Sequence, residues 1–299
     1  MKFVAKLHSS LQYCLFLVLL FTGVKLTAQI PEVEKAYLEK LYKATAGENW
    51  QNKWDLTTDV HAWYGLEITE GHVTGLNLFR NNLEGRIPKG ILALKKLKKL
   101  NLGFNALEGK LPAELFELTE LESLRLEMNK LSGSLPREYS KMHKLEELSL
   151  YNNLLEGAIP EAIGSMGSLK SLNLSSNYLE GSLPISIGNL TNLERLELFG
   201  NKLSGSIEVE LGKLKNLKEL ILSYNLFTGD LPSSTASLTK LEFIQLQGNN
   251  FTSLNTLLYL KSPKLTVFDS DDAFLNMKFG KGKIYKLHVA DTKFADNND

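Results

Sequence analysis

Asparagine returns at a fixed interval along most of this chain, and that interval limits the possible folds more than any other feature. Consecutive members of the series are 24 residues apart: Asn81, Asn105, Asn129, Asn153, Asn177, Asn201, Asn225 and Asn249. Each lies in the pattern L-x-x-L-x-L-x-x-N-x-L-x-G-x-(I/L)-P, complete between Leu121 and Pro136. A period of about 20–50 residues is typical of solenoids, whose repeats contact only their neighbours. We therefore expect a stack of similar coils.

The Leu-x-Leu part of the pattern predicts a short strand in each coil. Its leucines would point inward and the residue between them outward. Each buried leucine contributes about 1.5–3 kcal/mol, and no single coil can bury its own leucines, so adjacent coils are required. The asparagine follows the strand and enters a turn, where its amide can bond backbone groups that the turn leaves unpaired. Repeated in every coil, these amides predict a buried structural ladder.

This pattern resembles that of the leucine-rich repeat family. Its G-x-(I/L)-P ending resembles the plant-specific subclass, known from receptor-kinase ectodomains and polygalacturonase-inhibiting proteins, and extends from Val73 to about Pro263. The resemblance implies an α/β-type repeat solenoid, a right-handed superhelix with a parallel sheet on its concave face and a cap at each end. It also implies a protein or peptide partner, although this scaffold serves many ligands.

We expect the chain to divide into four segments. Residues 1–28 have a basic start, a short apolar run and Ala28 before Gln29, as in a secretory signal peptide. The apolar run is about half the 20 residues of a spanning helix, so cleavage is favoured over an uncleaved anchor. Residues 29–72 would form the N-terminal cap, 73–264 eight coils, and 265–299 the C-terminal cap and a polar tail.

The N-terminal cap should contain a helix over residues 31–47, ended by Gly47. Trp50, Trp54 and Trp63 follow it, and they are expected to form the cap core rather than a ligand site. The segment resembles the cap of plant-type arrays but lacks their cysteine pair, and its start resembles secreted bacterial leucine-rich repeat proteins. At the other end, residues 265–270 predict a partial ninth strand and residues 283–289 a further one.

Charge and motif content argue against several classes of protein. Lys plus Arg and Asp plus Glu each total 34, which does not favour nucleic-acid binding. Cys14 is the only cysteine, so neither a disulfide framework nor a cysteine-rich zinc site is possible. No catalytic motif is present, and the histidines lack metal-ligand spacing. We therefore expect no enzyme activity, cofactor or metal, with cation binding by Asp269, Asp271 and Asp272 left open.

The outward residues of the predicted strands carry the candidate ligand site. Aromatic and basic side chains have no core to fill there, and such exposed clusters often mark binding sites. The predicted site consists of Phe79, Arg80, Phe104, Arg125, Met128, Tyr151, Phe199 and Tyr224. An alternative is that Phe104, Met128 and Tyr224, at the strand ends, turn inward beneath the loop.

These features favour a secreted or cell-surface, non-catalytic protein that binds a protein or peptide through the concave strand face. Two alternatives remain open. One is binding of an extracellular glycan, since flat aromatic rings stack on sugars and the outward Asn, Ser and Gln side chains can bond hydroxyls. The other is a structural or adhesive spacer of the cell envelope. After signal cleavage no transmembrane segment is expected.

Overall fold

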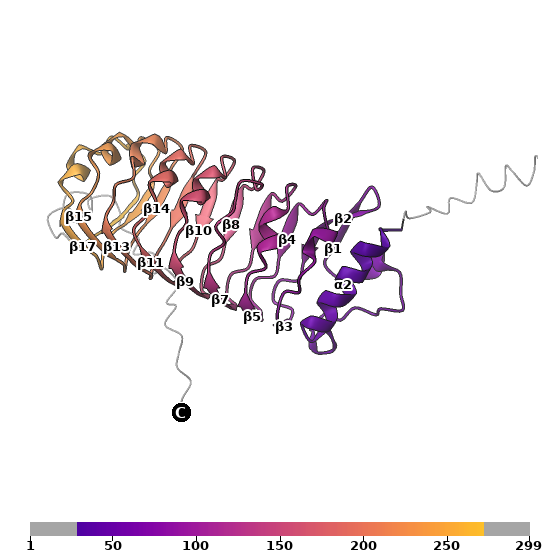
Figure 1. Cartoon of the computed structure of the whole chain (residues 1–299). Coiled ribbons are helices and arrows are strands. Elements are labelled where there is room, and N and C mark those ends of the chain that lie inside the picture. Colours follow the sequence, from indigo (N-terminus) through magenta and orange to yellow (C-terminus); the bar gives the residue numbers. More distant parts are fainter. Residues whose placement is uncertain (1–28, 272–299) are drawn as a thin grey trace, which may run out of the picture.

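The computed structural model describes residues 29–271, which form an elongated stack of coils beginning at a helical cap (Figure 1). A typical coil contains a strand, a tight turn, a second strand and a short 3-10 helix. This arrangement confirms the predicted α/β-type leucine-rich repeat solenoid. The predicted signal peptide, Asp272 and the predicted strand at 283–289 lie outside the described residues.

The Leu-x-Leu segments build a ten-stranded sheet, called here the long sheet. Its strands pair in parallel apart from the antiparallel hairpin of the first two. Leu124, Leu148 and Leu172 lie opposite one another on adjacent strands and are fully buried, as the alternation predicts. The strands are β1 (Leu66–Thr69), β2 (His72–Asn77), β4 (Lys99–Asn101), β6 (Ser123–Arg125), β8 (Glu147–Ser149), β10 (Ser171–Asn173), β12 (Arg195–Glu197), β14 (Glu219–Ile221), β16 (Phe243–Gln245) and β18 (Val267–Asp269). β18 confirms the partial ninth strand.

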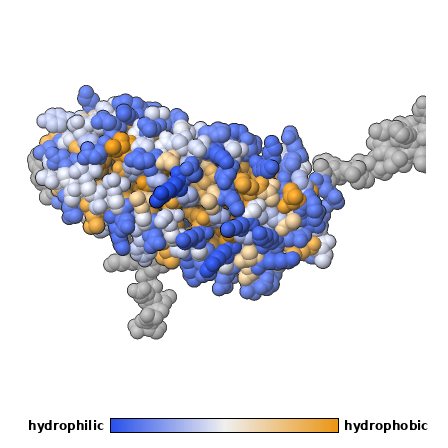
Figure 2. Space-filling model, viewed as in Figure 1, coloured by the Kyte–Doolittle hydropathy of each residue, from blue (hydrophilic) through white to orange (hydrophobic). Residues whose placement is uncertain are grey.

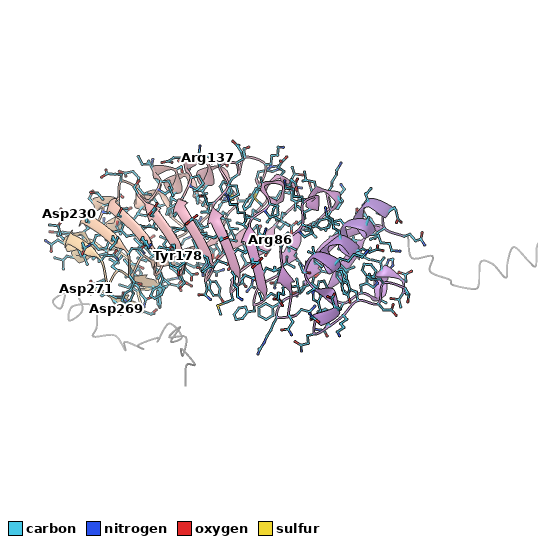
Figure 3. All side chains as sticks on the ribbon, turned by 60° about the horizontal axis from the view of Figure 1, so that its bottom comes forward. Arg86, Arg137, Tyr178, Asp230, Asp269 and Asp271 are labelled. Carbon is cyan, nitrogen blue, oxygen red and sulfur yellow. The ribbon has the colours of Figure 1, made fainter. Side chains whose placement is uncertain are left out.

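A second, eight-stranded parallel sheet follows the turns, where the sequence analysis predicted only turn structure. The segments that follow the ladder asparagines are extended and hydrogen-bond to their neighbours, with Leu131 buried and Gly133 at φ 79°. The alternation of apolar and outward residues in N-x-L-x-G was the available signal. The strands are β3 (Glu84–Gly85), β5 (Ala106–Lys110), β7 (Lys130–Ser134), β9 (Leu154–Ala158), β11 (Tyr178–Gly181), β13 (Lys202–Ser206), β15 (Leu226–Asp230) and β17 (Asn250–Ser253). Arg86, Tyr178 and Asp230 mark successive places along this side of the molecule (Figure 3).

The periodic asparagines bond the backbone across coils. The Oδ1 atom of Asn153 accepts from the N–H of Leu131 at 3.0 Å, and its Nδ2 donates to the carbonyls of Leu126 and Leu150 at 3.0 and 3.1 Å. Asn105, Asn129, Asn177, Asn201, Asn225 and Asn249 make corresponding bonds. Asn81 instead accepts from the N–H of Asn52, which connects the first coil to the cap.

The N-terminal cap begins with α2 (Glu32–Ala44), a shorter helix than the predicted 31–47. Gly47 does not end it. Ala46 takes the left-handed conformation, and Gly47 begins a 3-10 turn where any side chain would overlap the ring of Tyr42. The short 3-10 helices are η1 (Gly47–Asn49), η2 (Val60–Ala62), η3 (Ile91–Ala93), η4 (Ala113–Glu117), η5 (Glu161–Ser165), η6 (Ile185–Asn189), η7 (Leu211–Lys213), η8 (Ser233–Ser237) and η9 (Asn255–Tyr259).

The three tryptophans form the core of this cap, as the sequence predicts. Trp54 stacks on Trp63 with ring centroids 4.9 Å apart, and Trp50 meets Trp54 edge-on. Each indole N–H is bonded to a backbone carbonyl, and all three side chains are buried. Over residues 29–271, no helix combines the length and apolar character needed to cross a membrane.

Candidate functional site

The residue before each ladder asparagine has a left-handed backbone. This conformation costs an L-residue about 1–2 kcal/mol, so the turn must impose it. It occurs in all eight coils, at Arg80, Phe104, Met128, Asn152, Ser176, Gly200, Tyr224 and Gly248. Phe104 and Tyr224 are 37% and 54% exposed, so the alternative of an inward turn is wrong for both. Met128 is half-buried, and its Sδ accepts from Nδ2 of Asn152 at 2.8 Å.

The turn geometry brings four of the predicted site residues together as two aromatic pairs. Phe79 meets Phe104 of the next coil with ring centroids 4.9 Å apart and an interplanar angle of 55°. Five coils further along, Phe199 meets Tyr224 in the same relative positions, at 5.3 Å and 69°. Sequence spacing places these residues on one face, but only the left-handed turn explains why each outward ring pairs with the strand-end ring of the following coil.

An open groove of about 760 Å³ lies beside the first aromatic pair, where the cap meets the strand ends. Three predicted site residues, Arg80, Phe104 and Met128, contribute to its walls. The other lining residues are Asn49, Asn82, Glu84, Asn105 and Ala106. The groove therefore combines apolar and hydrogen-bonding side chains, as ligand-binding sites commonly do.

Arg125 ends β6, the fourth strand of the long sheet, and forms an ion pair that the sequence did not predict. Its Nη2 is 2.7 Å from Oε1 of Glu127, whose side chain is fully buried. The second carboxylate oxygen of Glu127 has no hydrogen-bond partner among the described residues. Burial, and then the charge of Glu127, raises the pKa of the nearby Tyr151 phenol. The charge of Arg125 is thus largely compensated by Glu127, two residues further along the chain.

Glu197 occupies the corresponding outward position of β12, and it too was not among the predicted site residues. Its Oε2 accepts from Nδ2 of Asn173 at 2.9 Å. Burial, and then repulsion by Glu219, raises the pKa of Glu197 to about 7, while Arg195 opposes the shift. The repeat pattern places Glu197 at an outward position of β12, but the burial of its carboxylate and the proximity of Glu219 depend on neighbouring coils.

We expect Glu197 to make stability depend on pH. An unfolded glutamate loses its proton near pH 4.3, whereas folded Glu197 loses it near pH 7. Between these values the folded state binds more protons, so the free energy of unfolding decreases as pH rises. Glu197→Gln should remove most of that decrease, which for these two pKa values is about 2–3 kcal/mol between pH 5 and 8, or about 5–10 °C in melting temperature. Calorimetric melting at both pH values tests this, and an unchanged slope in the variant would refute it.

Other parts of the described surface carry isolated features. Apolar patches on the face in view are interrupted by hydrophilic side chains along the whole array (Figure 2). Leu154, Tyr178 and Leu226 are exposed on the second sheet, apart from the aromatic pairs. Asp271 accepts from the N–H of Gly248 at 2.7 Å, and no cluster of potential metal ligands occurs within residues 29–271.

Family models match parts of the repeat region. Residues 136–203 match a leucine-rich repeat model, and residues 96–118 and 216–238 match a second model of the same family. A comparison with curated proteins finds no match.

Solved plant receptor ectodomains are similar in structure. The PEPR1–AtPEP1 structure has 26% identity and a TM-score of 0.70, over 80% of this chain and 38% of that one. The ectodomain of GASSHO1/SCHENGEN3 from Arabidopsis thaliana, solved with CASPARIAN STRIP INTEGRITY FACTOR 2, has 40% identity and a TM-score of 0.60. The match covers 64% of this chain and 24% of that one. The Arabidopsis receptor kinase HAESA, in complex with the peptide hormone IDA and the co-receptor SERK1, has 27% identity and a TM-score of 0.64. The match covers 80% of this chain and 46% of that one.

The chain therefore spans less than half the length of these three ectodomain chains. Likeness extends over most of the coils, and the family models match the repeats themselves. Together with the 24-residue period, the two parallel sheets and the asparagine ladder, these matches identify the chain as a leucine-rich repeat protein with plant-type repeats.

Proposed function

We propose that this protein is a secreted or cell-surface, non-catalytic binding protein that recognises a peptide or an extended protein segment on the outward face of the long sheet. The observation that carries the proposal is two aromatic contacts, Phe79–Phe104 and Phe199–Tyr224, on a sheet face with no layer packed over it in the described residues. Phe199 is half-buried and the other three rings are exposed. Exposed aromatic rings are costly to leave in water and are typical anchors in interfaces.

The relatives support this class of partner. The similar structures are PEPR1–AtPEP1, HAESA in complex with the peptide hormone IDA, and GASSHO1/SCHENGEN3 in complex with CASPARIAN STRIP INTEGRITY FACTOR 2. The proposed signal peptide at residues 1–28 would bring this chain to the same side of a membrane as such ligands. Arg80 lines the groove beside Phe104 and would contribute hydrogen bonds at the rim of the site, whereas Arg125 is already paired with Glu127.

The experiment is capture of partners by the chain from residue 29 onward, out of extracellular protein and from a glycan panel. We expect a variant with Phe79→Ala, Tyr151→Ala and Phe199→Ala to lose at least about tenfold in affinity for the captured partner, because a few aromatic anchors carry most of the binding energy of an interface. Surface plasmon resonance with the captured partner measures the loss.

A matched control is available on the second sheet, where Leu154, Tyr178 and Leu226 are also large and exposed. Alanine at these three positions should leave the affinity within about twofold of the parent chain, since rim or remote positions contribute little. Equal affinity of the long-sheet variant and the parent would refute the proposed site. Capture of a glycan in place of a protein would favour the alternative ligand class.

A further inference from the structure

Three polar side-chain atoms near the second aromatic pair are buried without a hydrogen-bond partner among the described residues. They are Oγ of Ser223, Oε1 of Gln245 and Oε1 of Gln247. Within residues 29–271 the other atoms of this kind belong to Glu127, Tyr139 and Thr235. A buried polar atom without a partner costs stability, so three of them in two adjacent coils need an explanation.

All three side chains occupy outward positions of the long sheet. Gln245 lies between the buried Ile244 and Leu246 on β16, and Gln247 and Ser223 each follow a buried strand leucine. Successive side chains of a strand point to opposite faces, so these three point away from the core. Ser223 and Gln245 are nevertheless only 0% and 4% exposed, and Gln247 is half-buried. The unpartnered atoms therefore belong to the face on which we propose binding, and not to the leucine core.

Asparagines at the position of Gln245 in other coils bond to their own coil. The Oδ1 atoms of Asn77, Asn101 and Asn173 each accept from the backbone N–H two residues further along, at 3.2, 3.1 and 3.0 Å. Glutamine is one methylene longer, and Oε1 of Gln245 has no such bond among the described residues. Its amide is therefore free to bond a ligand, and rotation about the unbranched side chain can bring it to the surface.

The ring of Tyr224 lies at the end of the same coil, the eighth, which contains Asn249. A Cβ atom on Gly248 would be 2.8 Å from Cδ1 of Tyr224, so the ring rests on the backbone next to Gln247. Phe199 meets this ring edge-on, and Tyr224 remains 54% exposed. Two amides and an aromatic ring therefore follow one another along the eighth coil.

The spacing of the two amides matches that of a peptide main chain. Residues i and i+2 of a strand lie on one face and about 6.6 Å apart, because the rise is about 3.3 Å per residue. Main-chain N–H and C=O groups on one edge of an extended peptide recur at the same interval. A glutamine amide carries an acceptor and donors side by side, so Gln245 and Gln247 can each bond one such pair of groups. The hydroxyls of a single sugar ring lie closer together and fit this spacing less well.

Resting on the proposed function, we propose that Gln245, Gln247 and Ser223 form a subsite that bonds the main chain of an extended peptide lying along the eighth coil, with one apolar side chain of that peptide on the ring of Tyr224. Main-chain hydrogen bonds contribute affinity without selecting a sequence, and the ring selects an apolar anchor. The stability that the unpartnered atoms cost the free protein is recovered when the peptide binds.

The first measurement is an NMR titration of the chain from residue 29 onward, with an isotope label in its glutamine side-chain amides. The probes are the uncharged peptides TVTVF and FVTVT, acetylated and amidated at their ends, which present the anchor in the two chain directions. This part of the chain has glutamine only at Gln29, Gln51, Gln245 and Gln247. We expect at least one probe to shift the signals of Gln245 and Gln247 and to leave those of Gln29 and Gln51 in place.

Ester replacement of single main-chain amides in the binding probe tests which groups are bonded. Each ester removes one N–H donor and keeps the side chains. Because only alternate residues of an extended chain present these groups on one edge, we expect affinity losses of about three- to tenfold at alternate positions and of less than about twofold between them. A ligand held through its side chains alone would show no such alternation.

A variant with Gln245→Met and Gln247→Met keeps the shape of both side chains and removes their amides. It should bind the probe about tenfold more weakly and lose the alternation among the esters. Its melting temperature should equal or exceed that of the parent chain, because it no longer buries an unpartnered oxygen at either position. Gln51→Met, at an exposed position in the N-terminal cap, is the matched control and should change neither binding nor the alternation.

Unchanged Gln245 and Gln247 signals at millimolar peptide, equal losses at successive ester positions, or full affinity of the double methionine variant would each overturn this inference. So would a shift of the two signals by chitotriose and by neither peptide. If the probes fail while the Phe79, Tyr151 and Phe199 alanine variant still loses the captured partner, the long-sheet site stands and only the subsite is wrong. If that alanine variant keeps its partner, the proposed site itself is wrong.

Discussion

Leu148→Ala is expected to lower the free energy of unfolding by about 2–5 kcal/mol. Leu148 lies in a central coil, is fully buried and faces Leu124 and Leu172 on the adjacent strands. Removing three carbons there leaves a cavity that neighbouring coils cannot close, because the backbone hydrogen bonds of the long sheet hold their spacing. Urea unfolding monitored by circular dichroism measures the change.

The same region offers a matched control for this substitution. Leu154 is in the same coil, at the start of β9, but it is 44% exposed. Leu154→Ala removes the same atoms from a place where water already reaches them, so the expected cost is less than about 1 kcal/mol. A cost below 1 kcal/mol for Leu148→Ala, or equal costs for the two variants, would contradict the inward placement of the strand leucines.

Asn153→Ala is expected to cost about 3 kcal/mol or more, although it removes little apolar surface. The Asn153 amide accepts from Leu131 and donates to the carbonyls of Leu126 and Leu150, all within the buried turn. A buried backbone group left without a partner costs about 1–3 kcal/mol, and alanine leaves several such groups in two coils. Thermal and urea unfolding measure the loss.

Asn192→Ala separates this effect from the general cost of losing an asparagine. Asn192 is exposed, and its Nδ2 donates to the carbonyl of Gly167, which water can replace. That substitution should change stability by less than about 1 kcal/mol. If Asn153→Ala costs no more than Asn192→Ala, the ladder does not stabilise the turns. Because neighbouring coils share each rung, the loss should also reduce the cooperativity of unfolding.

The repeat pattern predicted the regular part of the molecule well because each coil meets the same surroundings. A leucine at a given place in one coil packs against leucines at the same place in the next, as Leu148 does between Leu124 and Leu172. The position of a residue in the repeat then predicts both its local structure and its tertiary contacts, and such agreement is typical of repeat sequences that fold. The strand leucines and the asparagine series follow from it.

The second sheet was missed for a related reason. Its strands lie between an asparagine and a proline, both typical of turns, and the extended conformation is stabilised only when the same segment of the next coil lies alongside, as β9 lies beside β7. The sequence of a single coil does not contain the neighbouring strand that stabilises this conformation. Likewise, whether the three strand-end side chains turn inward or outward depended on a left-handed backbone angle that the residue types do not favour.

The chain alone thus specified which residues point inward, how often a coil repeats and which side of the strands is free to bind. The tertiary structure decided which outward side chains meet. Phe79 reaches Phe104 and Phe199 reaches Tyr224 because the turn imposes a positive φ on the residue before each ladder asparagine. It also decided that the buried Glu127 compensates the charge of Arg125, whereas Glu219 lies close enough to repel Glu197. Both contacts depend on packing between side chains and not on the repeat period.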